Sequence, residues 1–166
     1  RKMEAYGIGD EVLAWVREWL RDRKQRVGSG GCWSEWCRVL SGVPQGSVLG
    51  PILFLIFIDD LDEGLSSAIL KFADDTKIYG RVDCWEDRNK LQKDLERLVD
   101  WADKWQMSFN VGKCKVMHLG GHNLEWNYVM SQQRLKVVRE ERDLGVVLRD
   151  DLKVSSNCHQ AYAKAS

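Results

Sequence analysis

The chain has 166 residues, with 25 Lys and Arg against 25 Asp and Glu, 44% hydrophobic residues and eight Trp. This composition is typical of one folded domain and excludes a disordered chain. The zero net charge argues against a histone-like nucleic-acid binder, which works through a large basic excess. The charge is uneven, however, because residues 1–50, 51–110 and 111–166 carry net charges of +2, −5 and +3.

Nothing in the sequence favours a membrane or a secreted protein. The longest apolar run, residues 48–58, is well short of the roughly 20 residues that cross a bilayer. The N-terminus lacks a signal peptide, and five cysteines form no close-spaced disulfide framework. We therefore expect an intracellular chain, nuclear or cytoplasmic, with free thiols at Cys32 and Cys37. Because the first residue is not Met, we also expect a piece of a longer protein.

The first half of the chain predicts two helices separated by a hairpin. Residues 10–23 have apolar positions on one face and Asp10 as an N-cap. The glycines of residues 28–31 predict the turn of a β-hairpin. A turn-rich loop, residues 41–47, then leads into a buried helix from Pro51 to about Leu61.

The second half predicts a hairpin, a long helix and several strands. Two β-rich segments, residues 68–73 and 76–80, flank two adjacent aspartates, which predicts a hairpin with two carboxylates at its tip. From Glu86 to about Gln106, apolar residues at steps of four and three predict an amphipathic surface helix. The remaining elements are predicted as a strand over 113–119, a strand pair over 127–138, one strand over 143–148 and a helix over 154–165.

Three pairs of adjacent aspartates could do chemistry. Residues 59–60 end a helix and residues 150–151 lie in a turn, so we interpret both pairs as solvated. Asp74 and Asp75 differ because a strand on each side would fix them above a sheet. Adjacent carboxylates repel each other unless a cation or solvent offsets the repulsion. From the residues alone, the pair is either a divalent-cation site or a solvated hairpin turn.

Two other groups of residues remain weak signals. Cys114, His118 and His122 could be drawn as a zinc site, but residues four apart on a strand lie too far apart to share one ion. The eight Trp are interpreted as core and groove-lining residues. Base stacking on a Trp is an open possibility, but the sequence does not say which one.

Three motifs in order resemble the reverse transcriptases of non-LTR (LINE-type) retrotransposons. They are residues 41–51 (Ser-Gly-Val-Pro-Gln-Gly-Ser-Val-Leu-Gly-Pro), residues 71–76 (Lys-Phe-Ala-Asp-Asp-Thr) and residues 109–115 (Phe-Asn-Val-Gly-Lys-Cys-Lys). The resemblance covers nearly the whole chain and implies an α+β fold. That fold would be a polymerase-palm-like antiparallel sheet backed by helices, truncated at the N-terminus. Residues 1–150 would be a partial fingers and palm region, and residues 151–166 the start of a connection or thumb helix.

The resemblance also implies roles for single residues. Asp74 matches the position that ligates the metal ions, and Asp75 matches a supporting catalytic acid. Lys113 matches a lysine near the leaving pyrophosphate that serves as a proton donor. The loop bordering the incoming nucleotide and template matches Pro44, Gln45 and Gly46. Taken alone, these three residues are also typical of an ordinary β-turn.

The implied reaction is RNA-directed DNA polymerisation: a primer 3′-hydroxyl attacks the α-phosphorus of a dNTP at two Mg²⁺ (or Mn²⁺) ions. The implied partners are an RNA template, a DNA primer, dNTPs, and the rest of a polyprotein with fingers, thumb and an endonuclease. A third carboxylate comes, in the family, from a Phe-Asp strand before the first helix, and residues 1–9 contain no such strand.

We therefore expect residues 1–166 alone not to polymerise, and the isolated piece to be prone to aggregation through unpaired strand edges. Two alternatives stay open. The chain could be an inactive retrotransposon-derived remnant that at most binds nucleic acid. It could also be an unrelated cation-binding protein that uses Asp74 and Asp75 without any dependence on Gln45 or Gly46.

Overall fold

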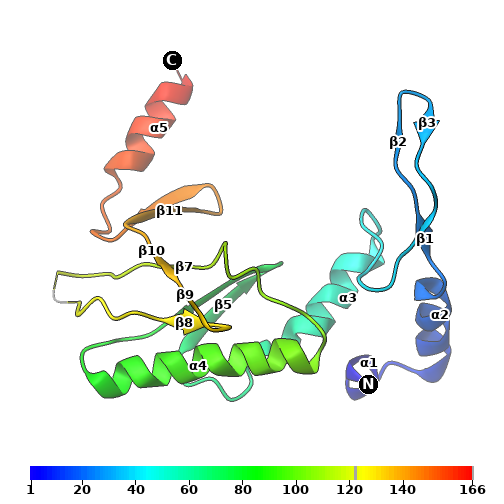
Figure 1. Cartoon of the computed structure of the whole chain (residues 1–166), viewed down its shortest axis with the longest axis horizontal. Coiled ribbons are helices and arrows are strands. Elements are labelled where there is room, and N and C mark those ends of the chain that lie inside the picture. The colour runs from blue at the N-terminus through cyan, green and yellow to red at the C-terminus, as the bar shows by residue number, and fades with distance from the viewer. Residues whose placement is uncertain (122, 166) are drawn as a thin grey trace. The chain divides into compact units, whose positions relative to one another are not determined.

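A computed structural model describes residues 1–121 and 123–165 of the chain (Figure 1). The chain divides into two compact units. The first unit comprises Arg1–Asp62 with Lys71–Asp75, and the second comprises Glu63–Leu70 with Thr76–Ser166. Helices and small sheets occur in both units, which confirms the α+β class. Within the described ranges, no helix is long and apolar enough to cross a membrane.

The first unit is built from helices and one extended hairpin. Its elements in chain order are α1 (Lys2–Ala5), α2 (Asp10–Leu20), β1 (Lys24–Gln25), β2 (Gly28–Ser29), β3 (Cys32–Trp33), β4 (Cys37–Arg38), α3 (Leu49–Ile58) and the 3₁₀ helix η1 (Asp59–Asp62). Strand β1 pairs with β4, and β2 pairs with β3, both antiparallel. The predicted glycine-turn hairpin is thus confirmed, and Cys32 and Cys37 are free thiols as expected.

The two helices of this unit differ in detail from the prediction. Gly9, not Asp10, is the N-cap of α2, so Asp10 lies in the first turn, where its charge favours the helix dipole. The helix also ends at Leu20, before the predicted Arg23. The expectation that α3 is buried was wrong, because Ile52 and Leu55 are half exposed. An all-apolar helix does not reveal in its sequence which faces are covered.

The second unit is organised around one long helix. A hairpin of β5 (Ala68–Phe72) and β6 (Asp75–Tyr79) precedes it, and its tip belongs to the first unit. The later elements are α4 (Trp85–Lys104), β7 (Lys115–Val116), β8 (Val129–Met130), β9 (Gln133–Arg134), β10 (Lys136–Val137), β11 (Glu140–Asp143), β12 (Val146–Arg149) and α5 (Ser155–Ala165). The hairpin at residues 68–80, the long helix and the C-terminal helix confirm the corresponding predictions.

Helix α4 buries the predicted apolar stripe and also holds a strand. Its side chains Leu95, Leu98 and Ala102 are buried. The side-chain amide of Gln92 donates to the carbonyl oxygen of Val129 at 2.9 Å and accepts from the Val129 N–H at 3.0 Å. Gln92 thus pairs with β8 as a neighbouring strand would, and Figure 1 shows β8 alongside α4.

Asp94 lies on the apolar face of α4 and is fully buried. The Ser66 N–H donates to both of its carboxylate oxygens at 3.1 Å, and the Ser67 N–H donates to one of them at 2.8 Å. The guanidinium of Arg97 donates to Asp94 at 3.2 Å and also to the Gly64 carbonyl oxygen. A buried carboxylate needs this set of donors to offset its lost hydration. These hydrogen bonds hold residues 64–67, the segment directly before β5.

The strands after α4 pair only two by two, so the palm-like antiparallel sheet stays a prediction. The described residues form two-stranded sheets only, and β7 pairs with β10 in parallel. Strands β8 and β9 confirm the pair expected over 127–138. The single strand expected over 143–148 was wrong, because β11 and β12 form a hairpin there. Leu144 and Gly145 have φ of +46° and +87°, the signature of a tight type I′ connection.

Replacing Asp94 should destabilise the second unit. Asp94→Ala leaves the N–H groups of Ser66 and Ser67 without an acceptor, and we expect a loss of about 2–4 kcal/mol in the free energy of unfolding. Asp94→Asn should also lower the free energy of unfolding, because the NH₂ group of the asparagine would face backbone N–H donors. Urea denaturation measures both effects. Asp100→Asn is the control, since Asp100 is exposed on the same helix; equal effects at positions 94 and 100 would contradict the proposed anchoring.

Candidate functional site

The acidic pair lies at the tip of the β5–β6 hairpin, as predicted. Ala73 and Asp74 form the two-residue connection, and Asp75 is the first residue of β6. Both carboxylates are exposed and make no hydrogen bond or ion pair within the described residues. Ala73 has φ of +50°, a left-handed conformation that costs energy for a residue with a side chain. A tight, strained turn thus presents two unpartnered carboxylates.

Lys71 holds the strand that leads to this tip. Its ammonium donates to the carbonyl oxygen of Asp59 at 2.7 Å and to the carboxylate of Asp62 at 2.5 Å. It also reaches the carbonyl oxygen of Ile58 at 3.5 Å. A cation at the carboxyl end of a helix satisfies carbonyl groups that have no partner in the helix. The contacts therefore anchor β5, three residues before Asp74, to the end of α3 and to η1.

The same contact changes the titration of Asp62. The hydrogen bond from the Lys71 ammonium lowers the pKa of the Asp62 carboxyl below its usual value, against a smaller opposing effect of burial. The side chain of Asp62 is 46% exposed, so solvent screens the interaction.

Residues 44–47 form a β-turn, which confirms the turn interpretation for the backbone of this loop. Gly46 has φ of +80°, as the third position of a type II turn requires. The Ser47 hydroxyl donates to the Pro44 carbonyl oxygen at 2.7 Å and accepts from the Gly50 N–H at 3.0 Å. Ser47 thus ties the loop to the first turn of α3, while Gln45 is exposed. The nucleotide-binding role of Pro44, Gln45 and Gly46 stays a prediction.

Lys113 lies in a turn rather than in the strand predicted over 113–119. Its N–H donates to the Asn110 carbonyl oxygen at 2.9 Å, and this bond closes the turn before β7 begins at Lys115. The Lys113 side chain is exposed. It belongs to the second unit, whereas Asp74 and Asp75 belong to the first, so its role as a proton donor stays a prediction.

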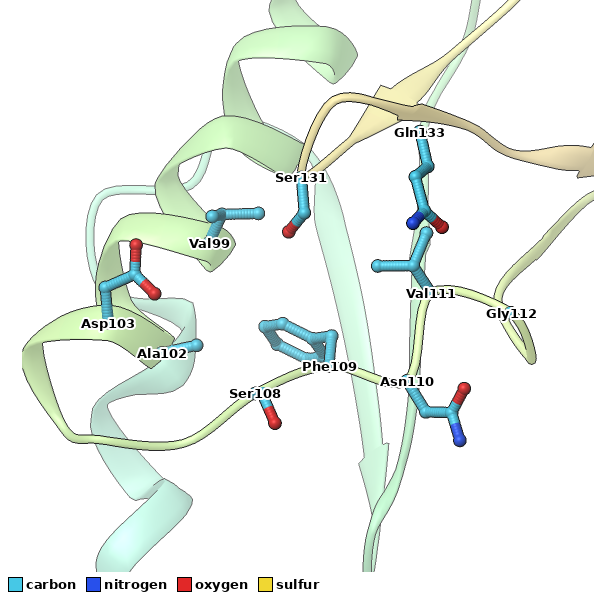
Figure 2. Close-up of a pocket in the computed structure, with 10 residues that line it drawn as sticks. All are labelled: Val99, Ala102, Asp103, Ser108, Phe109, Asn110, Val111, Gly112, Ser131 and Gln133. Atoms are coloured by element: carbon cyan, nitrogen blue, oxygen red, sulfur yellow. The ribbon is translucent and has the colours of Figure 1, made fainter.

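The loop before Lys113 covers a cavity of about 430 Å³ in the second unit (Figure 2). Figure 2 shows the ring of Phe109 pointing into this cavity, with Val99 of α4 on one side and Val111 on the other. Ser131 and Gln133, from the β8–β9 hairpin, complete the opposite wall. Residues 109–112 of the motif therefore line this cavity together with α4 and the β8–β9 hairpin.

The donors at the hairpin tip suit a hard divalent cation. Mg²⁺ takes oxygen ligands and uses only one or two protein carboxylates beside waters and substrate phosphates. The exposed carboxylates of Asp74 and Asp75 carry oxygens of this kind. Within the described ranges, no group of three His, Cys, Asp or Glu side chains could hold a metal. The zinc arrangement considered above includes His122, which lies outside the described residues.

A family model described as "Reverse transcriptase (RNA-dependent DNA polymerase)" matches residues 1–148. The chain belongs to the reverse transcriptase family. The "RNA-directed DNA polymerase from mobile element jockey" of Drosophila funebris is 34% identical over 116 residues, which are 64% of this chain and 13% of the relative. The "Probable RNA-directed DNA polymerase from transposon X-element" of Drosophila melanogaster is 33% identical over 104 residues, 59% of this chain and 12% of the relative.

These relatives confirm the resemblance to non-LTR reverse transcriptases. They also make an unrelated cation-binding protein a poor interpretation of the acidic pair. The chain spans about an eighth of the length of the curated relatives it matches.

The contacts of two residues that position the hairpin were not predicted from the sequence. Asp94 was counted among the charges of an amphipathic helix, although it stands three residues after Leu91 and four before Leu98, in the middle of the apolar stripe. A charge inside an apolar stripe is the signal that could have found it. Lys71 was part of the quoted motif, but no pattern in the sequence pairs it with residues 59–62.

Lys71→Met should weaken the first unit in a pH-dependent way. Because the pKa of Asp62 is lowered in the folded chain, its contribution is present above its ordinary pKa and is lost as pH falls through the folded value. We expect a loss of about 0.5–1 kcal/mol near neutral pH that shrinks at about pH 2.5. Urea denaturation at both pH values measures it. Lys93→Met, an exposed lysine on α4, is the control; a pH-independent effect at Lys71 would contradict the assignment.

Proposed function

We propose that this chain forms part of the palm of an RNA-directed DNA polymerase and contributes two metal-binding carboxylates, Asp74 and Asp75. The observation that carries the proposal is the exposed, unpartnered pair at the tip of the β5–β6 hairpin, within the residues matched by the family model. Asp94 and Lys71 support it, because they anchor the base and one strand of this hairpin through charged contacts. In this proposal β5 and β6 belong to a palm-like sheet.

The reaction is the transfer of a nucleotide to a primer. The primer 3′-oxygen bonds to the α-phosphorus of a dNTP, the bond to the bridging oxygen breaks, and pyrophosphate leaves. Two divalent ions, Mg²⁺ or Mn²⁺, supply activation of the hydroxyl and neutralisation of the phosphates. The carboxylates of Asp74 and Asp75 hold metal at a fixed place. The short, strained turn at Ala73 limits the positions of the two carboxylates. It therefore favours one arrangement of the metal-binding oxygens.

Other residues of the chain have roles in the same proposal. The turn at Pro44, Gln45 and Gly46 borders the nucleotide and template, because a glycine lets backbone approach a base pair and the Gln45 amide can donate to nucleic acid. Lys113 is exposed in its turn and is available to protonate the leaving pyrophosphate. Helix α5 is the start of a connection or thumb segment.

The whole protein would need more than these residues. A third carboxylate must complete a two-metal site, and the described residues place no third acid, His or Cys beside Asp74 and Asp75. The proposed partners are an RNA template, a DNA primer, dNTPs, and the fingers, thumb and endonuclease parts of a polyprotein. Such a protein works inside the cell, in the nucleus or the cytoplasm, where these substrates occur.

Metal binding tests the assignment on the chain itself. Asp74→Asn and Asp75→Asn each remove one anionic oxygen donor, and we expect each to weaken Mn²⁺ binding on the order of tenfold. Water-proton relaxation in a Mn²⁺ titration measures the affinity. Asp150→Asn and Asp151→Asn form the matched control, because they alter the other adjacent pair that lies in a turn. Equal losses at both pairs would show a solvated, nonspecific site.

Primer extension tests the polymerase. Residues 1–166 alone should give no templated product with Mg²⁺ or Mn²⁺, because a third carboxylate is lacking. A chimera of the jockey polymerase that carries this chain in place of its matched region should incorporate dNTPs on an RNA template. Its activity should vanish with Asp74→Asn and persist with Asp150→Asn. Incorporation by the chimera that survives Asp74→Asn would overturn the proposal.

A further inference from the structure

The hairpin formed by residues 23–38 carries two large aromatic rings in solvent. Strands β1 and β4 form its base, and β2 and β3 form its far end, which extends away from α2 in Figure 1. Trp33 is 63% exposed and Trp36 is 57% exposed. Burial of a Trp stabilises a fold by several kcal/mol, so two exposed Trp on one small hairpin need an explanation.

An arginine organises the two rings. The guanidinium carbon of Arg26 lies 4.1 Å from the centroid of the Trp33 ring and 4.6 Å from that of the Trp36 ring. Both distances are well within the range of cation–π attraction. The three side chains therefore form one cluster, the Trp33–Arg26–Trp36 cluster, in which a positive charge is held against two indoles.

The backbone is shaped to receive one of these rings. Gly28 lies directly opposite Trp33 in the β2–β3 ladder. A Cβ atom on Gly28 would lie 2.5 Å from the Trp33 ring, so only glycine permits the ring to lie on this strand. The ring is thereby held in place before any ligand arrives, which lowers the entropic cost of stacking on it.

The charges of the hairpin favour an anionic partner. Residues 23–38 contain the basic side chains Arg23, Lys24, Arg26 and Arg38 and one acidic side chain, Glu35. Lys24 and Arg38 lie directly opposite each other in the β1–β4 ladder. Like charges in such a pair destabilise a hairpin, and neither side chain has an ion-pair partner among the described residues. An anion beside the two cations would remove that cost.

We propose that the hairpin of residues 23–38 binds single-stranded nucleic acid. Unpaired bases stack on Trp33 and Trp36, and phosphates contact Lys24 and Arg38. Aromatic faces beside a basic track are the combination that binds single strands without reading their sequence. This inference rests on the proposed function in one respect only: that the bound single strand is the template of a polymerase. The binding itself uses no metal and neither Asp74 nor Asp75.

Binding of a labelled single-stranded RNA of about 12 nucleotides to the full chain tests the proposal by fluorescence anisotropy in EDTA. Trp33→Ala and Trp36→Ala should each weaken binding about 5- to 100-fold, the range for loss of one base–aromatic stack. Trp36→Phe should retain most of the affinity. Trp85→Ala is the matched control, because Trp85 is 59% exposed but is followed by the acidic Glu86 and Asp87. The Trp85→Ala variant should bind the RNA as tightly as the unchanged chain does.

Salt dependence tests the phosphate contacts separately. Lys24→Ala and Arg38→Ala should each reduce the slope of log affinity against log salt by about 0.7, the value for one phosphate on a single strand. Equal affinity of the Trp33→Ala, Trp36→Ala and unchanged chains would overturn the proposal, and so would preferential binding of duplex RNA. Because EDTA removes divalent ions, a failure here is distinct from a failure of Mn²⁺ binding at the acidic pair.

Discussion

The buried carboxylate of Asp94 is the interaction on which the candidate site depends. A charged group at zero exposure is tolerated only where donors surround it, and the N–H groups of Ser66 and Ser67 supply them. These donors come from the segment directly before β5. Helix α4 thus supplies more than an apolar face, because it fixes the point at which the strand carrying the acidic pair begins.

Lys71 acts on the same strand near its other end. Its contacts with the Asp59 carbonyl oxygen and the Asp62 carboxylate are made to residues at the end of α3 and in η1. The Asp94 contacts thus hold the segment before β5, and the Lys71 contacts hold β5 three residues before Asp74. The carboxylates of Asp74 and Asp75 make none of these anchoring hydrogen bonds. Their four carboxylate oxygens therefore have no protein partner among the described residues.

The sequence predicted the elements whose pattern is local, and missed the contacts that join distant segments. The periodic stripe of α4 and the β-rich flanks of Asp74 and Asp75 fixed two elements correctly, because each signal lies within one element. The turn at Leu144 and Gly145 was missed because a leucine at positive φ gives no turn signal. The roles of Asp94 and Lys71 were missed because their partners lie 27 or 28 and 9–13 residues away, respectively.

Net charge is a poor guide to nucleic-acid binding in this chain. Several acidic and basic side chains form ion pairs within the chain, such as Lys71 with Asp62, and these pairs add nothing to the net charge. The described charges that stay unpaired include Asp74 and Asp75 on one hairpin and Lys24 and Arg38 on another. The first pair suits phosphates through a bound cation, and the second suits phosphates directly. Under the two proposals, both pairs would bind the phosphates of a nucleic acid, so a net charge of zero does not exclude such a partner.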